Sequence, residues 1–133
     1  MLDIKYIAEH PEEIKDGLAK KGYTKETLDV DALIALYRDI AKLKTSSQAL
    51  SEEKNKLSNS IKSASAEERP AIIAKSKSVG EELKVEQEKL AAEQAKFDDM
   101  MLRMPNMPSP ESPVGKDDSE NVVRRKVGTP RSF

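Results

Sequence analysis

Apolar residues recur at alternating steps of three and four along two stretches of the chain, from Leu33 to Ile61 and from Ile72 to Met104. Such spacing is typical of helices that bury one stripe against a partner helix. In the first stretch two rows repeat every seven residues, namely Leu36, Leu43, Leu50, Leu57 and Leu33, Ile40, Ser47, Lys54, Ile61. The second stretch carries a matching row of Leu83, Leu90, Phe97 and Met104. These repeats predict two long helices that form a coiled coil.

The two stretches mirror each other about a polar midpoint, so the second helix is predicted to run back along the first. The pairs related by this mirror are Leu36 with Phe97, Leu43 with Leu90, Leu50 with Leu83, and Ile61 with Ile72. The reversal then lies near Ala66 and Glu67. Ser65 and Glu68 have the spacing of a capping box, which marks the start of a helix.

We expect an arm helix over residues 31–63 and a return helix over residues 68–104, each roughly 50 Å long at about 1.5 Å per residue. Pro70 fits only the first turn of the return helix, and Pro105 cannot continue it. Polar residues at the seam positions Ser47 and Lys54 predict a narrow, weakly packed seam toward the turn.

Two short helices are predicted over residues 3–21, because Pro11 suits the first turn of a second helix and Gly22 suits a helix end. Residues 105–133 contain four closely spaced prolines and predict an extended tail. The expected fold is therefore all-α: a long antiparallel two-helix coiled-coil hairpin, with the short N-terminal helices packed at its base. Residues 1–104 would form the helical arm and residues 105–133 an extended linker.

Composition narrows the chemistry of the chain. It has 35% charged and 37% hydrophobic residues, no cysteine and one histidine, His10. Disulfides, thiolate metal sites and redox chemistry are therefore not expected. No apolar run approaches the ~20 residues that a bilayer requires, and no signal peptide is recognisable, so we expect a cytoplasmic protein.

Charge is polarised along the expected hairpin. Residues 54–79, which we call the tip, carry six basic and two acidic side chains, whereas residues 81–99 carry three basic and seven acidic ones. A basic tip can attract a phosphate backbone, although such charges are also typical of ordinary solvated helix faces.

Other candidate sites have simpler explanations. Asp98 and Asp99 point about 100° apart on a helix, so they do not form a catalytic carboxylate pair. Met100, Met101, Met104 and Met107 fit packing at the base of the arm better than a promiscuous binding surface. His10 precedes a helix and is expected to be a cap or a surface residue. We assign no catalytic residue and no metal ligand.

The chain resembles the N-terminal arm of bacterial seryl-tRNA synthetases over essentially its whole length. The segments that carry the resemblance are Met1-Leu2-Asp3-Ile4-Lys5, Pro11-Glu12, Lys54-Asn55-Lys56-Leu57-Ser58, Pro105-Asn106-Met107-Pro108, Pro113-Val114-Gly115-Lys116-Asp117, Asn121-Val122, and Gly128-Thr129-Pro130 with Phe133. The chain departs from the family at Val127, where many relatives have an aromatic residue, and in its compact turn around Ala66.

The resemblance implies that this arm grips the long variable arm of serine tRNA. It also implies that the full-length enzyme, a class II homodimer, activates serine with ATP and Mg²⁺ and attaches it to that tRNA. The catalytic domain would follow Phe133, so this piece alone should be inactive and needs no cofactor.

We predict that the basic side chains of the tip contact phosphate, helped by neutral donors and acceptors on the arm helix; these residues are Lys54, Asn55, Lys56, Ser58, Lys62, Arg69, Lys75 and Lys77. The alternative is a coiled-coil protein-interaction module or a chaperone-like hairpin that does not bind RNA. A chaperone hairpin should expose apolar residues at its tip, whereas this tip is rich in serine and lysine.

Overall fold

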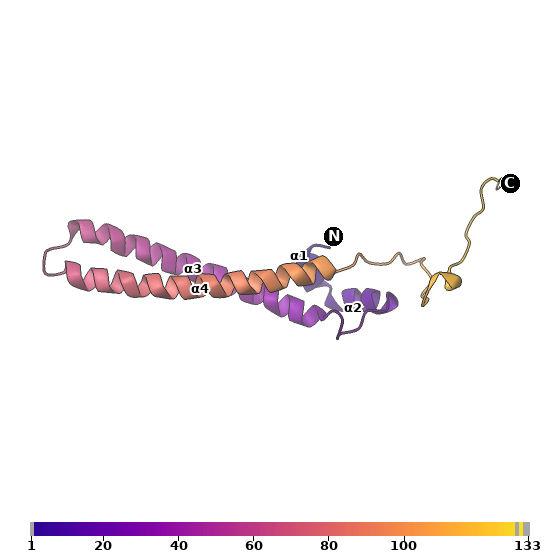
Figure 1. Cartoon of the computed structure of the whole chain (residues 1–133), viewed down its shortest axis with the longest axis horizontal. Coiled ribbons are helices and arrows are strands. Elements are labelled where there is room, and N and C mark those ends of the chain that lie inside the picture. Colours follow the sequence, from indigo (N-terminus) through magenta and orange to yellow (C-terminus); the bar gives the residue numbers. More distant parts are fainter. Residues whose placement is uncertain (1, 130, 132–133) are drawn as a thin grey trace. The chain divides into compact units, whose positions relative to one another are not determined.

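The computed structural model describes residues 2–129 and 131, and all regular structure within them is helical (Figure 1). The elements are α1 (Ile4–Glu9), α2 (Pro11–Lys20), α3 (Val30–Ser63), α4 (Arg69–Arg103) and a short 3-10 helix, η1 (Asp118–Glu120). The described part of the chain contains no strand, which confirms the all-α prediction. The ends of α3 and α4 lie within one residue of the predicted helix ends.

The chain divides into two compact units. One comprises Asp31–Met104, and the other joins Met1–Val30 to Pro105–Phe133. Met1, Pro130 and Phe133, which contribute to the sequence resemblance, lie outside the described residues.

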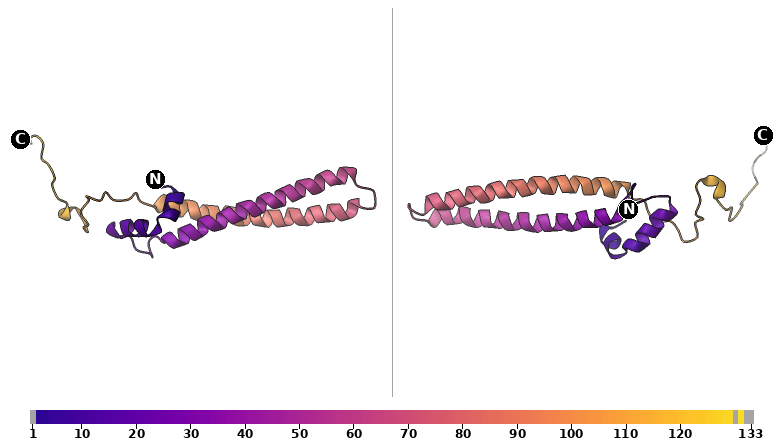
Figure 2. Two further views of the ribbon diagram at one scale, coloured as in Figure 1. Left: turned by 180° about the vertical axis from the view of Figure 1, so that it is seen from behind. Right: turned by 90° about the horizontal axis from the view of Figure 1, so that it is seen from below.

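The unit of residues 31–104 is an antiparallel hairpin, in which α3 and α4 run side by side in opposite directions (Figures 1 and 2). The rings of Tyr37 and Phe97 lie 6.3 Å apart across the hairpin. Farther along, the hydroxyl of Ser46 donates to the carboxylate of Glu86. The mirror places Leu36 opposite Phe97, and the observed ring contact is made by the next residue, Tyr37.

Burial along the hairpin is uneven. Leu33, Ile40 and Leu83 are buried, and the row that begins at Leu36 is half-buried. No residue from Gln48 to Ser78 is buried. Val79 on α4 is buried as well. The seam between the helices therefore becomes thin between Val79 and the turn, as the polar seam positions predict.

The turn between α3 and α4 is closed by the predicted capping box. The hydroxyl of Ser65 donates to Glu68 Oε2 over 2.8 Å, and the backbone N–H groups of both residues bond back to the partner side chain. Pro70 stands in the first turn of α4, where its missing N–H is tolerated. These local signals explain why the reversal falls at residues 64–68.

In the other unit, α2 ends in a Schellman motif. The Gly22 N–H donates to the Ala19 carbonyl, and the Tyr23 N–H donates to the Leu18 carbonyl. Gly22 has φ +77°, a left-handed conformation that glycine adopts without strain. The predicted helix end at this glycine is confirmed.

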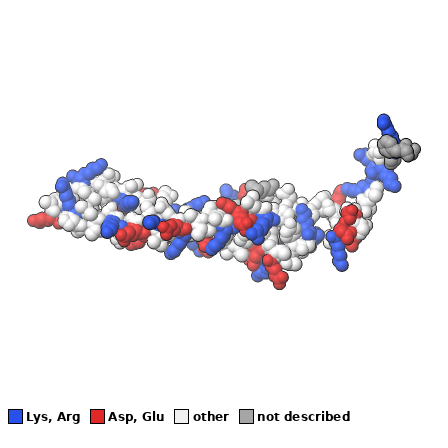
Figure 3. Space-filling model, in the orientation of Figure 1, with Lys and Arg blue, Asp and Glu red and all other residues white. Residues whose placement is uncertain are grey.

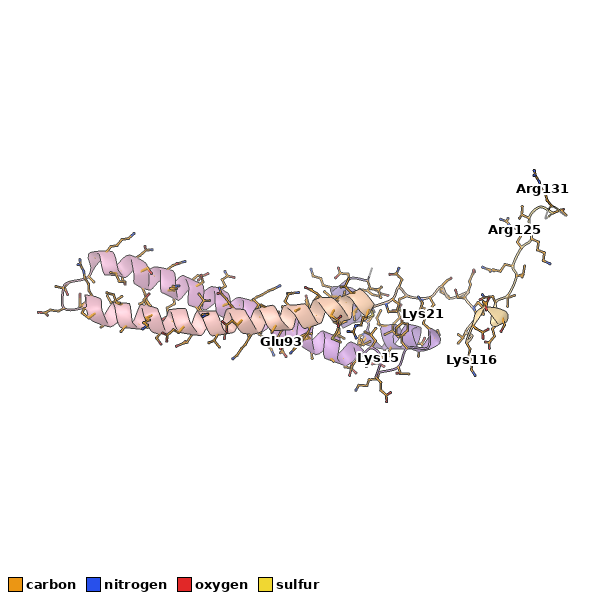
Figure 4. All side chains as sticks on the ribbon, in the orientation of Figure 1. Lys15, Lys21, Glu93, Lys116, Arg125 and Arg131 are labelled. Atoms are coloured by element: carbon orange, nitrogen blue, oxygen red, sulfur yellow. The ribbon has the colours of Figure 1, made fainter. Side chains whose placement is uncertain are left out.

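The first residues after α4 lie against α2. The ammonium of Lys21, labelled in Figure 4, donates to the Asn106 carbonyl over 2.5 Å. The side chain of Met107 occupies the space where a Cβ on Gly17 would lie. A glycine in the middle of α2 thus allows the chain to pass close to the helix.

Candidate nucleic-acid interface

All eight residues predicted to contact RNA lie on the hairpin, and all are exposed. Five of them lie in the last turns of α3, and the other three lie in the first turns of α4. Four of the cations form no ion pair or hydrogen bond within the described residues, namely Lys54, Lys56, Lys62 and Lys77. Their ammonium groups are available to a ligand.

Lys54 stands on the seam row but is not covered by α4. Its Nζ lies 3.8 Å from the position that a Cβ on Gly80 would take. The side chain therefore crosses α4 at a glycine and reaches solvent there. Its long aliphatic stem can lie along the seam while the charged end stays in water.

Residues spaced by four share one side of a helix, so Lys54, Ser58 and Lys62 form a stripe along the last turns of α3. Lys56 points about 200° away from Lys54, to the other flank. The cations thus surround the tip rather than gather on a single face.

Arg69 begins α4 and also closes the turn. Its Nε donates to the Ala64 carbonyl over 3.1 Å. One donor of the guanidinium is used by the turn, which fixes the direction of the side chain. A guanidinium has further N–H donors that suit phosphate oxygens.

Lys75 differs from the other tip lysines because it has a carboxylate partner on the opposite helix. Its Nζ lies 2.9 Å from Glu53 Oε1. The hydrogen bond and the charge of Glu53 raise the pKa of Lys75. The ammonium is therefore charged at neutral pH but already engaged.

Nearer the base of the hairpin, basic side chains pair with carboxylates on their own helix. Figure 3 shows one face, on which several blue side chains and one red one lie near the turn, and red and blue side chains lie together farther along. Glu93, labelled in Figure 4, bonds Lys96 over 2.8 Å. The other such pairs are Lys42–Asp39, Lys84–Glu88 and Arg103–Asp99. Arg38, Lys44 and Lys89 make no such pair in the described part of the chain, but carboxylates outnumber cations over residues 81–99, so the excess of positive charge lies at the tip.

A shallow hollow beside the turn was not predicted from the sequence. It is lined by residues of both helices and of the turn between them, namely Ser60, Ser63, Ala64, Glu68, Ala71 and Ile72. The hydroxyls of Ser60 and Ser63 donate to carbonyls of their own helix. The spacing of these serines by three is the signal that could have indicated a shared face.

No group of three or more histidine, aspartate or glutamate side chains among the described residues is arranged to hold a metal ion. None of the described helices combines the length and the apolar character needed to cross a membrane.

The profile of the seryl-tRNA synthetase N-terminal domain matches residues 1–108. The chain belongs to this family. A serine–tRNA ligase of Deinococcus radiodurans is 36% identical over 96% of the chain, and one of Burkholderia lata is 37% identical over 100% of it. The chain spans 29% and 30% of the length of these two relatives.

A solved structure agrees with the family assignment. The seryl-tRNA synthetase of Pyrococcus horikoshii, determined in complex with ATP, superposes with a TM-score of 0.79 at 31% identity. The match covers 92% of this chain and 28% of that one. The seryl-tRNA synthetase N-terminal domain thus accounts for the hairpin and for most of the chain around it.

Proposed function

We propose that the hairpin is a tRNA-binding arm, which grips the long variable arm of serine tRNA through the phosphates of its backbone. The observation that carries this proposal is the set of unpaired cations at the tip of a hairpin that belongs to the seryl-tRNA synthetase family. Helical RNA is recognised mainly by its shape and its phosphates, because its major groove is too narrow for side chains.

The dimensions of the hairpin support the same function. With 34 residues in α3 and 35 in α4, the arm extends roughly 50 Å. Its cations lie at the end where the seam is thinnest, and the carboxylates of residues 81–99 disfavour phosphate nearer the base. The phosphates of an RNA helix are therefore attracted to the tip of the arm and not to residues 81–99.

Lys54, Lys56, Lys62, Arg69, Lys75 and Lys77 would contact phosphate, and Asn55 and Ser58 would bond sugar or phosphate oxygens. Each of these side chains is exposed, and the ammonium groups are long enough to follow a mobile phosphate. Residues 1–104 would form the arm, and residues 105–133 would lead toward the catalytic domain.

The activity of the full-length enzyme is part of the proposal. The remaining length of the relatives would hold ATP, with Mg²⁺, and serine, and would attach serine to its tRNA in a homodimer in the cytoplasm. We assign no residue of this chain to those steps. The part played by this chain is to bind and orient the tRNA.

An electrophoretic shift tests the proposal. Serine tRNA should bind more tightly than a version whose variable stem has been shortened, because the shortened RNA offers fewer phosphates to the tip. Equal affinity for the two RNAs would contradict recognition of the variable arm. Absence of RNA binding together with capture of unfolded protein would favour the chaperone-like alternative.

A further inference from the structure

One carboxylate of the hairpin reaches across to a tip cation. Glu53 on α3 pairs with Lys75 on α4 at 2.9 Å, and the two side chains keep 43% and 61% of their exposure. This pair lies in the thin part of the seam, where no residue from Gln48 to Ser78 is buried. The neighbouring Glu52 makes a different contact, since Gln48 on its own helix donates to it over 3.2 Å.

Binding of a phosphate to Lys75 must compete with Glu53. A lysine that already has a carboxylate partner releases fewer counterions when it meets RNA, so it contributes less affinity than a free lysine. The tip lysines on α3, such as Lys62, have no such competitor within the described residues. Lys75 is thus the tip lysine whose contribution to RNA affinity is reduced by a carboxylate partner.

We propose that Glu53 limits the affinity of the tip for RNA by holding the ammonium of Lys75 across the hairpin. This inference rests on the proposed function, because it concerns the same phosphate-binding surface. Its consequence is that Lys75 contributes less affinity to a bound RNA than a lysine without a carboxylate partner. Glu53 then weakens non-specific binding of the tip to the phosphate backbone of RNA.

Four variants of the 133-residue chain test this inference by filter binding at about 50 mM salt. They are Glu53→Gln, the charge-matched control Glu52→Gln, Lys75→Ala, and Glu53→Gln combined with Lys75→Ala. The probes are serine tRNA and an RNA duplex of about 16 base pairs with an arbitrary sequence. Circular dichroism checks that each variant keeps its helix content, and Glu53→Ala serves as a second replacement.

Glu53→Gln should tighten binding of both probes by about two- to five-fold, the range expected when an exposed ion pair is broken. Its dependence on salt should become steeper by about 0.7 to 0.9 in log K against log salt, because one more phosphate is neutralised. Glu52→Gln should give a clearly smaller gain. In the Lys75→Ala background, Glu53→Gln should give no gain.

The inference is overturned if Glu53→Gln and Glu52→Gln tighten binding equally, or if the gain persists without Lys75. Either result would mean that only the local charge matters. If serine tRNA and the arbitrary duplex bind equally well, the proposed function fails, while the comparison of variants still decides the role of Glu53. If neither probe binds wild type or Glu53→Gln, both proposals fail.

Discussion

Glu68 shows how single residues shape the turn that presents the cations. Its carboxylate accepts hydrogen bonds from the hydroxyl and the backbone N–H of Ser65. These bonds favour the charged form and lower the pKa of Glu68 below its ordinary value. A carboxyl group whose pKa is lower in the folded state stabilises the fold above its unfolded pKa and loses that contribution as pH falls through the folded pKa.

The turn should therefore loosen in acid, below the ordinary glutamate range near pH 4.5. We predict that Ser65→Ala, which removes the hydroxyl but keeps the backbone N–H, moves the pKa of Glu68 part of the way back to its ordinary value and weakens this dependence on pH. An NMR titration of the Glu68 carboxyl carbon measures the effect, with Glu67→Gln as the control. A pKa that is unchanged in Ser65→Ala would contradict the hydrogen-bonded turn.

Ser47 is the polar residue that is buried on the seam, with 9% of its surface exposed. Its hydroxyl finds no hydrogen-bond partner in the described part of the chain. An unsatisfied buried hydroxyl destabilises a fold, and serine favours helix less than alanine does. We predict that Ser47→Ala raises the free energy of unfolding by about 1 kcal/mol.

Urea denaturation measures that change. Ser51→Ala on the same helix is the matched control, because Ser51 is only half-buried and should gain from helix propensity alone. Equal effects of the two substitutions would mean that the Ser47 hydroxyl is satisfied, for example by water.

At the scale of the helices, the hairpin is packed unevenly along its length. Leu33, Ile34 and Ile40 are buried near the start of α3, whereas residues 48–78 contain no buried side chain. Local unfolding of a segment with few buried side chains costs less free energy than local unfolding of a well-packed segment. Backbone amides of the tip should therefore exchange with solvent faster than those of residues 33–46.

Hydrogen–deuterium exchange followed by mass spectrometry measures this gradient. Serine tRNA, if it binds as proposed, should slow exchange in residues 48–78 and leave residues 33–46 nearly unchanged. Uniform protection along α3 and α4 in the free chain would contradict a seam that weakens toward the turn.

The helices could be predicted from sequence because their signals are local or periodic. The heptads from Leu33 to Ile61 set the register, and Ser65 with Glu68 set the turn. The tip cations could be located for the same reason, because the position of a residue along a predicted helix sets its distance from the turn.

Contacts that depend on side-chain reach between distant segments could not be predicted. The pairing of Glu53 with Lys75 needs the relative rotation of two helices, which a heptad pattern does not specify for residues beside the seam. The approach of Met107 to Gly17 depends on the path of an irregular segment. The bond from Arg69 to the Ala64 carbonyl depends on the conformation of the turn.

At the scale of the whole molecule, a net charge of −1 conceals a separation of charge along the hairpin. Four basic side chains near the base pair with carboxylates of their own helix, whereas the tip carries six cations and only two carboxylates. A nearly neutral chain can therefore bind a polyanion at one end. Membership of the seryl-tRNA synthetase N-terminal domain family makes tRNA the polyanion that we propose.

The salt dependence of binding to serine tRNA tests this account most directly, measured for the wild-type chain and for the combined variant Lys62→Ala, Arg69→Ala and Lys75→Ala. The slope of log K against log salt should fall by about two, because the variant loses the phosphate contacts of Lys62 and Arg69 and the smaller contribution of Lys75, which Glu53 weakens. Binding should also weaken. An unchanged slope would contradict the assignment of the tip as the RNA-binding surface.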